Sequence, residues 1–228
     1  MYQPATGIGR LLDRLAKGQP LTDPRALITG RDAINLRLVL ADWWILIDEP
    51  LRARRILGQV LAERSPATPD QKCYARMHLA DLDFTAQHLE GFRAGYELAL
   101  KDRPTNPWAA RQHLVLAVDD YGRLQQQRSA LERFDRIQRD FPASPQARSA
   151  GWYRGVIFWW GGHWREAAAA WDDLDRRYPD HPWRSVLATD YRPRLAQAIA
   201  AKLPADAPPP PRPARPDPTN DEHPKDAP

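Results

Sequence analysis

The stretch Arg139-Asp140-Phe141-Pro142-Ala143-Ser144-Pro145 separates two segments whose apolar residues recur at helical spacing. Its first proline cannot continue a helix, and its second has a backbone φ suited to the first position of a new one. Ser144 stands directly before that second proline, where its side-chain oxygen can accept an amide hydrogen of the first helical turn. The stretch therefore predicts one helix that ends near Phe141 and another that begins at Pro145.

The same pattern of two prolines separated by two residues occurs four times at an almost constant interval. The four linkers are Pro66-Ala67-Thr68-Pro69, Pro104-Thr105-Asn106-Pro107, Pro142-Ala143-Ser144-Pro145 and Pro179-Asp180-His181-Pro182. Their first prolines are 38, 38 and 37 residues apart, and such self-similarity is the signature of a repeat protein. Thr68, Asn106 and Ser144 are predicted N-caps, whereas His181 is a poorer one.

Each unit between linkers has helical apolar spacing with a break near its middle, as a two-helix hairpin requires. In the fourth unit the break is Gly161-Gly162, which predicts one helix over residues 145–160 and another over 163–178. The sequence therefore predicts an all-α stack of about four hairpins between residues 32 and 178. The other breaks are expected near Gly122, between Gln87 and Gly91, and at Asp48-Glu49-Pro50.

Each pair of expected helices carries a similar set of side chains. A small residue midway along the first helix is followed by an aromatic one turn later, a small residue early in the second helix is followed by another aromatic, and a proline closes the unit. The fourth unit has Gly155, Phe158, Ala167, Trp171 and Pro179, and the third has Val118, Tyr121, Ala130, Phe134 and Pro142. The degenerate second and first units have Ala80, Asp83, Phe92, Tyr96 and Pro104, and Ala41, Trp44, Ala53, Leu57 and Pro66.

This set resembles the tetratricopeptide repeat family over roughly residues 32–184. The period of 37 to 38 residues exceeds the family's usual length of about 34. In this respect the chain is similar to the longer repeats of bacterial envelope proteins, such as the Tol-Pal coordinator and the outer-membrane-assembly lipoprotein. The resemblance implies a right-handed α-solenoid and a non-catalytic scaffold that holds a partner peptide or domain in a concave groove.

The N-terminal residues 1–30 precede the repeats and are predicted to form capping helices. Ile8, Leu11, Leu12 and Leu15 would lie on one face of a short helix that ends at Gly18. Such a helix can cover the open face of the first hairpin, as the terminal units of a repeat array require. The alternative is a helix that lies on a membrane surface.

The array and a closing helix interrupted at Pro193 are expected to occupy residues 31–203. Residues 204–228 contain ten prolines and no aromatic or large aliphatic residue. A segment without apolar groups to bury cannot offset the entropy of ordering, which predicts a disordered tail. The alternative is that residues 208–213 form a polyproline ligand for another domain.

Composition and charge exclude several classes of protein. The formal charge is +4, but arginines are spread through the chain between aspartates, which does not favour a nucleic-acid-binding surface. No segment has the roughly 18 uninterrupted apolar residues of a membrane span. The chain as given begins without a signal-peptide pattern, which predicts a cytoplasmic protein, or an envelope-associated one only if the true start lies upstream.

The sequence carries no recognisable catalytic, cofactor or metal motif. Cys73 is the only cysteine, and no two of the six histidines have the four-residue spacing of a zinc-binding helix. Phosphate-binding loops and the glycine-flanked serine of hydrolases are also missing. The sequence therefore predicts a protein that is not an enzyme and needs no cofactor.

The residue after the small residue of the first helix tends to face the groove in the tetratricopeptide family. Alignment through Ala41, Ala80, Val118 and Gly155 puts Asp42, Asp81, Asp119 and Val156 at that position. The resemblance therefore implies three aspartates along the groove, ending at Trp152 and Trp160, and a partner that is basic and has an apolar anchor. The alternative is that these aspartates are solvated or paired with the chain's own arginines.

Tryptophans crowd the fourth unit, and they favour a second hypothesis. They are Trp152, Trp159, Trp160, Trp164 and Trp171. Tryptophan anchors both hydrophobic cores and binding sites, so some of these residues either line an interface or fill a core against the closing helix. The second hypothesis is thus an assembly subunit that oligomerises through this hairpin. The sequence leaves the oligomeric state open.

Overall fold

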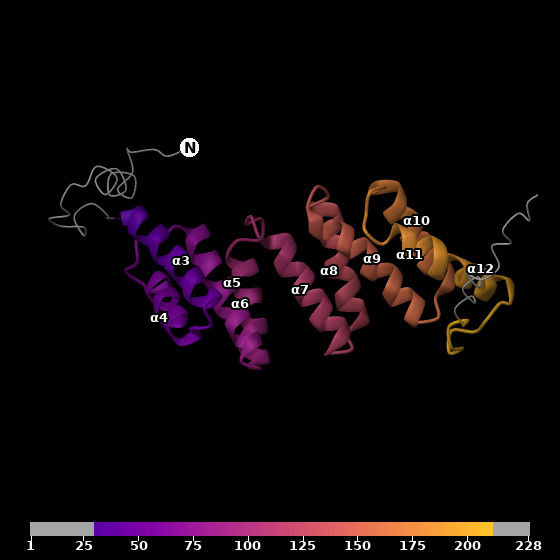
Figure 1. Cartoon of the computed structure of the whole chain (residues 1–228), viewed down its shortest axis with the longest axis horizontal. Coiled ribbons are helices and arrows are strands. Elements are labelled where there is room, and N and C mark those ends of the chain that lie inside the picture. The colour runs from indigo at the N-terminus through magenta and orange to yellow at the C-terminus, as the bar shows by residue number, and fades with distance from the viewer. Residues whose placement is uncertain (1–29, 212–228) are drawn as a thin grey trace, which may run out of the picture. The chain divides into compact units, whose positions relative to one another are not determined.

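The computed structural model describes residues 30–211, and all the regular secondary structure in that range is helical (Figure 1). The prediction of an all-α fold built from consecutive hairpins is confirmed. The chain divides into two compact units, Met1–Gln112 and His113–Pro228. The boundary lies inside a single helix, where the sequence has no linker composition to signal it.

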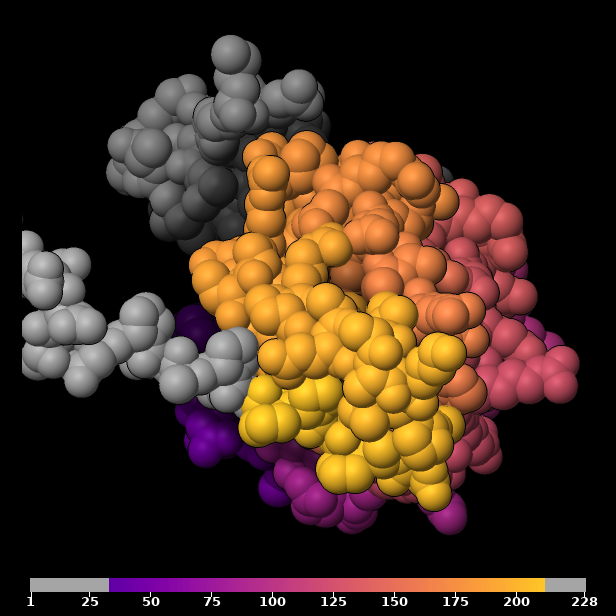
Figure 2. Space-filling model, turned by 90° about the vertical axis from the view of Figure 1, so that its right-hand side faces the viewer, coloured from indigo at the N-terminus to yellow at the C-terminus, as the bar shows by residue number. Residues whose placement is uncertain are grey.

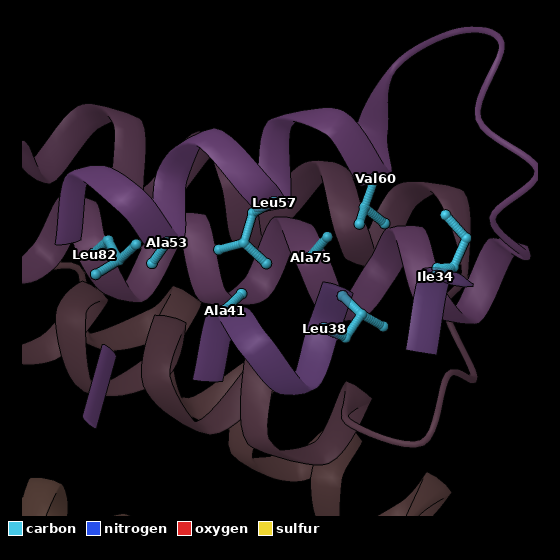
Figure 3. Packing of buried hydrophobic residues seen from close by; sticks show 8 residues of the cluster. All are labelled: Ile34, Leu38, Ala41, Ala53, Leu57, Val60, Ala75 and Leu82. Carbon is cyan, nitrogen blue, oxygen red and sulfur yellow. The ribbon is translucent and has the colours of Figure 1, made fainter. Parts of the chain in front are cut away.

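The first unit contains two complete hairpins. Helices α3 (Gly30–Leu46) and α4 (Pro50–Leu61) form the first, and α5 (Pro69–Thr85) and α6 (Leu89–Asp102) form the second. Their shared core is drawn in Figure 3: Ile34, Leu38 and Ala41 from α3, Ala53, Leu57 and Val60 from α4, and Ala75 and Leu82 from α5. Since α5 contributes to the core of the first hairpin, consecutive hairpins stack through buried apolar side chains.

The second unit continues the pattern and then closes it. Helix α7 (Ala109–Gly122) crosses the unit boundary and is followed by α8 (Gln127–Asp140), α9 (Pro145–Trp160) and α10 (Trp164–Arg177). The expected closing helix consists of α11 (Arg184–Val186), a π-helical turn η1 (Leu187–Tyr191) and α12 (Arg192–Ala200). The interruption was expected at Pro193, which lies in the first turn of α12, directly after the π-helical turn, and a proline has no amide hydrogen to donate to the preceding turn of a helix.

In two of the proline linkers the predicted N-cap residue caps the next helix. Thr68 forms a capping box with Gln71, and the Ser144 hydroxyl accepts a hydrogen bond from the amide of Ala147 at 3.2 Å. Asn106 behaves differently: its side chain is buried and accepts from the amide of Trp108 at 2.8 Å, and α7 begins only at Ala109. The expectation of a helix that starts at Pro107 was therefore wrong by two residues.

The turn inside each hairpin passes through one residue in the left-handed region, namely Asp48, Gln87, Gln125 and Gly162. In three turns the last loop amide bonds to the carbonyl five residues back, as His163 does to Phe158. In the third turn Gln126 reaches six residues back, to Asp120. This turn is therefore one residue longer than the others.

The longer turn corrects the alignment of the third unit. Val118 was expected to be the small residue packed inside the hairpin, but it is 40% exposed, whereas Ala117 is fully buried. The extra turn residue shifts α7 by one position relative to its partner helix. The second helices keep their predicted register, since all their pattern residues are buried: Ala53, Leu57, Phe92, Tyr96, Ala130, Phe134, Ala167 and Trp171.

The first residues of the proline-rich segment pack on the second unit. The indole nitrogen of Trp164 donates to the carbonyl of Leu203 at 3.1 Å, and Arg194 donates to the carbonyl of the buried Pro210. A Cβ added to Gly162 would lie 2.0 Å from the carbonyl oxygen of Ala205. Figure 2 shows α12 and the residues after it (yellow) over the fourth hairpin (orange). The prediction that the tail is disordered from residue 204 on therefore does not hold for residues 204–211.

Substitution of Gly155 tests how closely α9 and α10 pack within the fourth hairpin. A Cβ at this position would lie 2.0 Å from the indole nitrogen of Trp171, so Gly155→Ala should force α9 and α10 apart at a cost of about 1–3 kcal/mol. Gly58→Ala is the matched control, because a Cβ there meets no atom within 4 Å and an alanine should stabilise α4 by about 0.5–1 kcal/mol. The melting temperatures of the two variants, measured by circular dichroism, should shift in opposite directions from that of the parent chain. Equal shifts would contradict the packing of Gly155.

Truncation tests whether the segment after Leu203 stabilises the second unit. A chain that ends at Pro211 should melt like the full-length chain, whereas one that ends at Pro204 should melt several degrees lower, since it loses the contacts of Ala205 and Pro210. The measurement is the melting temperature by circular dichroism. If the chain that ends at Pro204 melts with the full-length chain, residues 205–211 contribute nothing to folding.

Candidate binding surface

A row of polar side chains lies along one face of α5. Tyr74, His78 and Asp81 are spaced by four and three positions, so their side chains stack on the same side of the helix. Helix α3 supplies Asp42 to this row, and the start of α7 supplies Arg111. All these residues belong to the first unit.

Asp42 is held by a tyrosine. The hydroxyl of Tyr74 donates to Oδ2 of Asp42 at 2.8 Å, and the Tyr74 ring lies between those of His78 and Trp108, with centroid distances of 4.3 and 5.1 Å. Burial and the hydrogen bond to Asp42 raise the pKa of Tyr74 to about 12. The phenol therefore stays protonated and keeps donating to the carboxylate at neutral pH.

The other oxygen of Asp42 has no hydrogen-bond partner. Oδ1 is buried as an atom, although the Asp42 side chain as a whole is 41% exposed. Its nearest cationic candidate is Nε2 of His78, 3.8 Å away, which is beyond hydrogen-bonding distance. A carboxylate oxygen that has lost water without gaining a donor is energetically unfavourable, and a partner could reach this carboxylate only through the exposed part of the side chain.

Asp81 already has partners within the chain. Tyr96 donates to its Oδ1, and Nη2 of Arg111 donates to its Oδ2 at 2.9 Å. Burial and the neighbouring carboxylate raise the pKa of Tyr96 far above its ordinary value. For Asp81 the arrangement matches the alternative in which the aspartates pair with the chain's own arginines. A partner's cation would have to compete with Arg111 there.

His78 lies between the two aspartates. Its side chain is 18% exposed. Burial lowers the pKa of the imidazole, while the negative charges of Asp42 and Asp81 oppose that shift. His78 is therefore mostly neutral at pH 7. It does not provide a full positive charge to balance the negative charge of Asp42.

The first unit also contains an apolar recess. It has a volume of about 700 Å³ and lies at the turn ends of the first two hairpins. Its apolar wall includes Ile45, Leu51 and Leu82. Ile45 is one helical turn from Asp42 on α3, and Leu82 follows Asp81 on α5, but no side chain of the polar row lines the recess.

Asp119 belongs to the second unit and has a different environment. Its carboxylate accepts two hydrogen bonds from Arg123, at 2.6 and 2.7 Å, and is 8% exposed. Because α7 aligns through Ala117, Val118 occupies the position that corresponds to Asp42 and Asp81. The structure thus brings Asp42 and Asp81 together with Tyr74 and His78, but gives Asp119 its own arginine.

The two tryptophans expected at the end of the groove also have different environments. Trp152 stacks on Trp183 with an interplanar angle of 10° and meets Tyr191 edge to face. It is therefore part of an aromatic cluster that attaches the closing segment to the fourth hairpin. Trp160 is 60% exposed at the end of α9 and remains available to a partner.

Sequence reasoning missed Tyr74, His78 and Arg111. The spacing of Tyr74, His78 and Asp81 could have indicated a polar helix face, but their contacts with α3 and α7 follow only from packing. Among residues 30–211, no group of three or more histidine, cysteine or acidic residues is arranged to hold a metal ion. In the same range, no helix is both long and apolar enough to cross a membrane.

Comparison of the chain with protein-family models, curated proteins and solved structures found no match. The site is therefore interpreted from the side chains of this chain alone.

The coupling between His78 and Asp42 can be measured by NMR titration of the imidazole, assigned with a His78→Gln variant. The pKa of His78 should lie below 6.5, and Asp42→Asn should lower it further, because the substitution removes a negative charge that favours the protonated ring. Glu97→Gln, on α6, is the control and should leave the titration unchanged. An unchanged pKa in Asp42→Asn would show that the two groups do not interact.

Proposed function

We propose that this chain is a non-catalytic binding scaffold of the tetratricopeptide type, a right-handed α-solenoid that holds a peptide or domain on the first-helix faces of its hairpins. The family assignment is supported by the repeat period and by the buried pattern residues of the second helices. The preferred partner is a basic segment with an apolar anchor. Its cation would approach Asp42, and its anchor would enter the recess beside Ile45 and Leu82.

The observation that carries this proposal is the state of the Asp42 carboxylate. Tyr74 fixes its orientation, its Oδ1 lacks a donor, and the adjacent His78 is mostly neutral. A lysine or arginine from a partner would supply the compensating charge at the exposed part of this carboxylate. The side chain is already held in place, so binding costs little of its conformational entropy.

The second hypothesis, assembly through the tryptophan-rich hairpin, has less support. Trp159, Trp164 and Trp171 are buried within the second unit, and Trp152 stacks against the closing segment. Trp160 is left as the exposed aromatic of α9. A single exposed tryptophan is a small surface compared with the roughly 800 Å² that each partner buries in a standard interface.

The proposal is tested by selecting peptides from a random library on the full-length chain. Selected peptides should be basic and contain a large apolar residue. Affinity for Asp42→Asn should fall on the order of 2- to 5-fold, the equivalent of an ion pair of about 0.5–1 kcal/mol, and the loss should shrink as salt is raised. Asp102→Asn, a partly exposed aspartate on α6 that pairs with Arg76, is the control and should bind normally.

Two results would contradict the scaffold. Selected peptides that are acidic, or that bind Asp42→Asn as tightly as the parent at every salt concentration, would rule out Asp42 as the recognition group. Sedimentation addresses the alternative: a concentration-independent oligomer that dissociates in a Trp160→Ala variant would favour assembly through the fourth hairpin.

A further inference from the structure

The outer face of α3 is apolar and exposed. The residues of α3 that enter the core are Ile34, Leu38 and Ala41. On the opposite side of the helix lie Leu36, Leu40, Trp43 and, just past its end, Ile47, which are 40%, 40%, 49% and 44% exposed. Their spacing of four, three and four positions makes a continuous stripe, here called the α3 stripe. A helix that is apolar on two opposite sides is normally covered on both.

The repeat shows what such a stripe contacts in the other hairpins. Alignment of Ala41 with Ala80 puts three stripe residues in register with Ala75, Leu79 and Leu82 of α5. Ala75 and Leu82 are buried in the core of the preceding hairpin, and Leu79 packs against it. The stripe position of α5 thus faces the helices that come before it in sequence.

The fourth hairpin follows the same rule. Gly155 aligns with Ala41, so Ala150, Arg154 and Ile157 correspond to Leu36, Leu40 and Trp43. Ala150 and Ile157 are buried, and Arg154 pairs with Asp135 of the preceding helix α8 at 2.9 Å. The stripe position on the first helix of a hairpin is therefore the surface on which the preceding helix packs. Among residues 30–211, no helix precedes α3.

We propose that the α3 stripe is the docking site of residues 8–17 of the same chain. These residues lie outside the part of the chain that the structure describes, and their sequence predicts a helix with Ile8, Leu11, Leu12 and Leu15 on one face. Both this face and the stripe have their apolar residues at helical spacing. At 1.5 Å per residue, it is about 10 Å long against about 17 Å for the stripe from Leu36 to Ile47.

The connecting chain is long enough for this docking. The stripe is centred about 17 Å along the helix from Gly30, at 1.5 Å per residue. Gly18–Thr29, if extended, spans up to about 40 Å. Residues 8–17 can therefore turn back beside α3 even if part of the connection is folded. The contact is intramolecular and leaves Asp42 on another side of α3, where Tyr74 of α5 contacts it, so it is independent of the binding role proposed above.

Photo-crosslinking in the full-length chain tests the docking without assuming a register. Benzoylphenylalanine in place of Leu12 should crosslink within its own chain to the stripe residues Leu36, Leu40, Trp43 or Ile47, as mapped by mass spectrometry. A mixture of isotopically labelled and unlabelled chains separates intrachain from interchain products. Benzoylphenylalanine at Arg10, on the opposite face of the predicted helix, is the control and should give few products with α3. Interchain products at the stripe would mean that a second copy covers it and would overturn the proposal, as would the absence of α3 products.

A double-mutant cycle gives a second, independent measurement. Leu12→Asp and Leu40→Asp should each lower the melting temperature of the first unit by several degrees, and the combined loss should be clearly smaller than the sum, because each variant already removes the same contact. Leu98→Asp, at an exposed apolar residue of α6 outside the stripe, should add independently to Leu12→Asp. Additive losses for Leu12→Asp and Leu40→Asp would overturn the proposal.

Discussion

Close approach of two helices at a small residue is the constraint on which each hairpin depends. In the fourth hairpin Gly155 leaves room for the indole of Trp171, whose nitrogen donates to the carbonyl of Trp152 at 3.3 Å. In the second hairpin Ala80 meets Gly95, where an added Cβ would lie 2.9 Å from the Cβ of Ala80. A side chain one methyl larger would have to push the helices apart. This contact fixes the rotation of the first helix about its own axis, and so the direction in which its other faces point.

The candidate binding surface follows from that orientation. Once Ala41 and Ala80 face the partner helix, the next residues, Asp42 and Asp81, turn toward the side of α3 and α5 that carries Tyr74 and His78. Their chemistry then depends on their neighbours. Asp81 receives Arg111 and Tyr96 and becomes part of the structure, whereas Asp42 receives a neutral phenol and a mostly neutral imidazole. Two equivalent positions of a repeat thus differ in how much negative charge they offer.

The ends of a repeat array present a general physical problem, because the terminal helices have no neighbour to bury their apolar faces. At the C-terminal end the described residues solve it locally: Tyr191 and Trp183 pack on Trp152, and Ala205 lies against the turn at Gly162. At the start of the described chain the equivalent face of α3 is exposed. The difference explains why Leu36, Leu40 and Trp43 of α3 are large apolar side chains that remain exposed.

The sequence by itself determined the helices and their pairing. Prolines and N-cap residues act within one turn, so the linkers and most helix ends could be located from local chemistry. The buried pattern of the second helices was equally visible, since helical periodicity needs no knowledge of distant contacts. Only the tertiary structure decided the rest. The extra residue in the turn before Gln126 became visible only once α7 was placed against its partner helix. The arginine partner of Asp81 and the packing of residues 203–210 depend on groups far apart in the sequence, whose proximity no local pattern encodes.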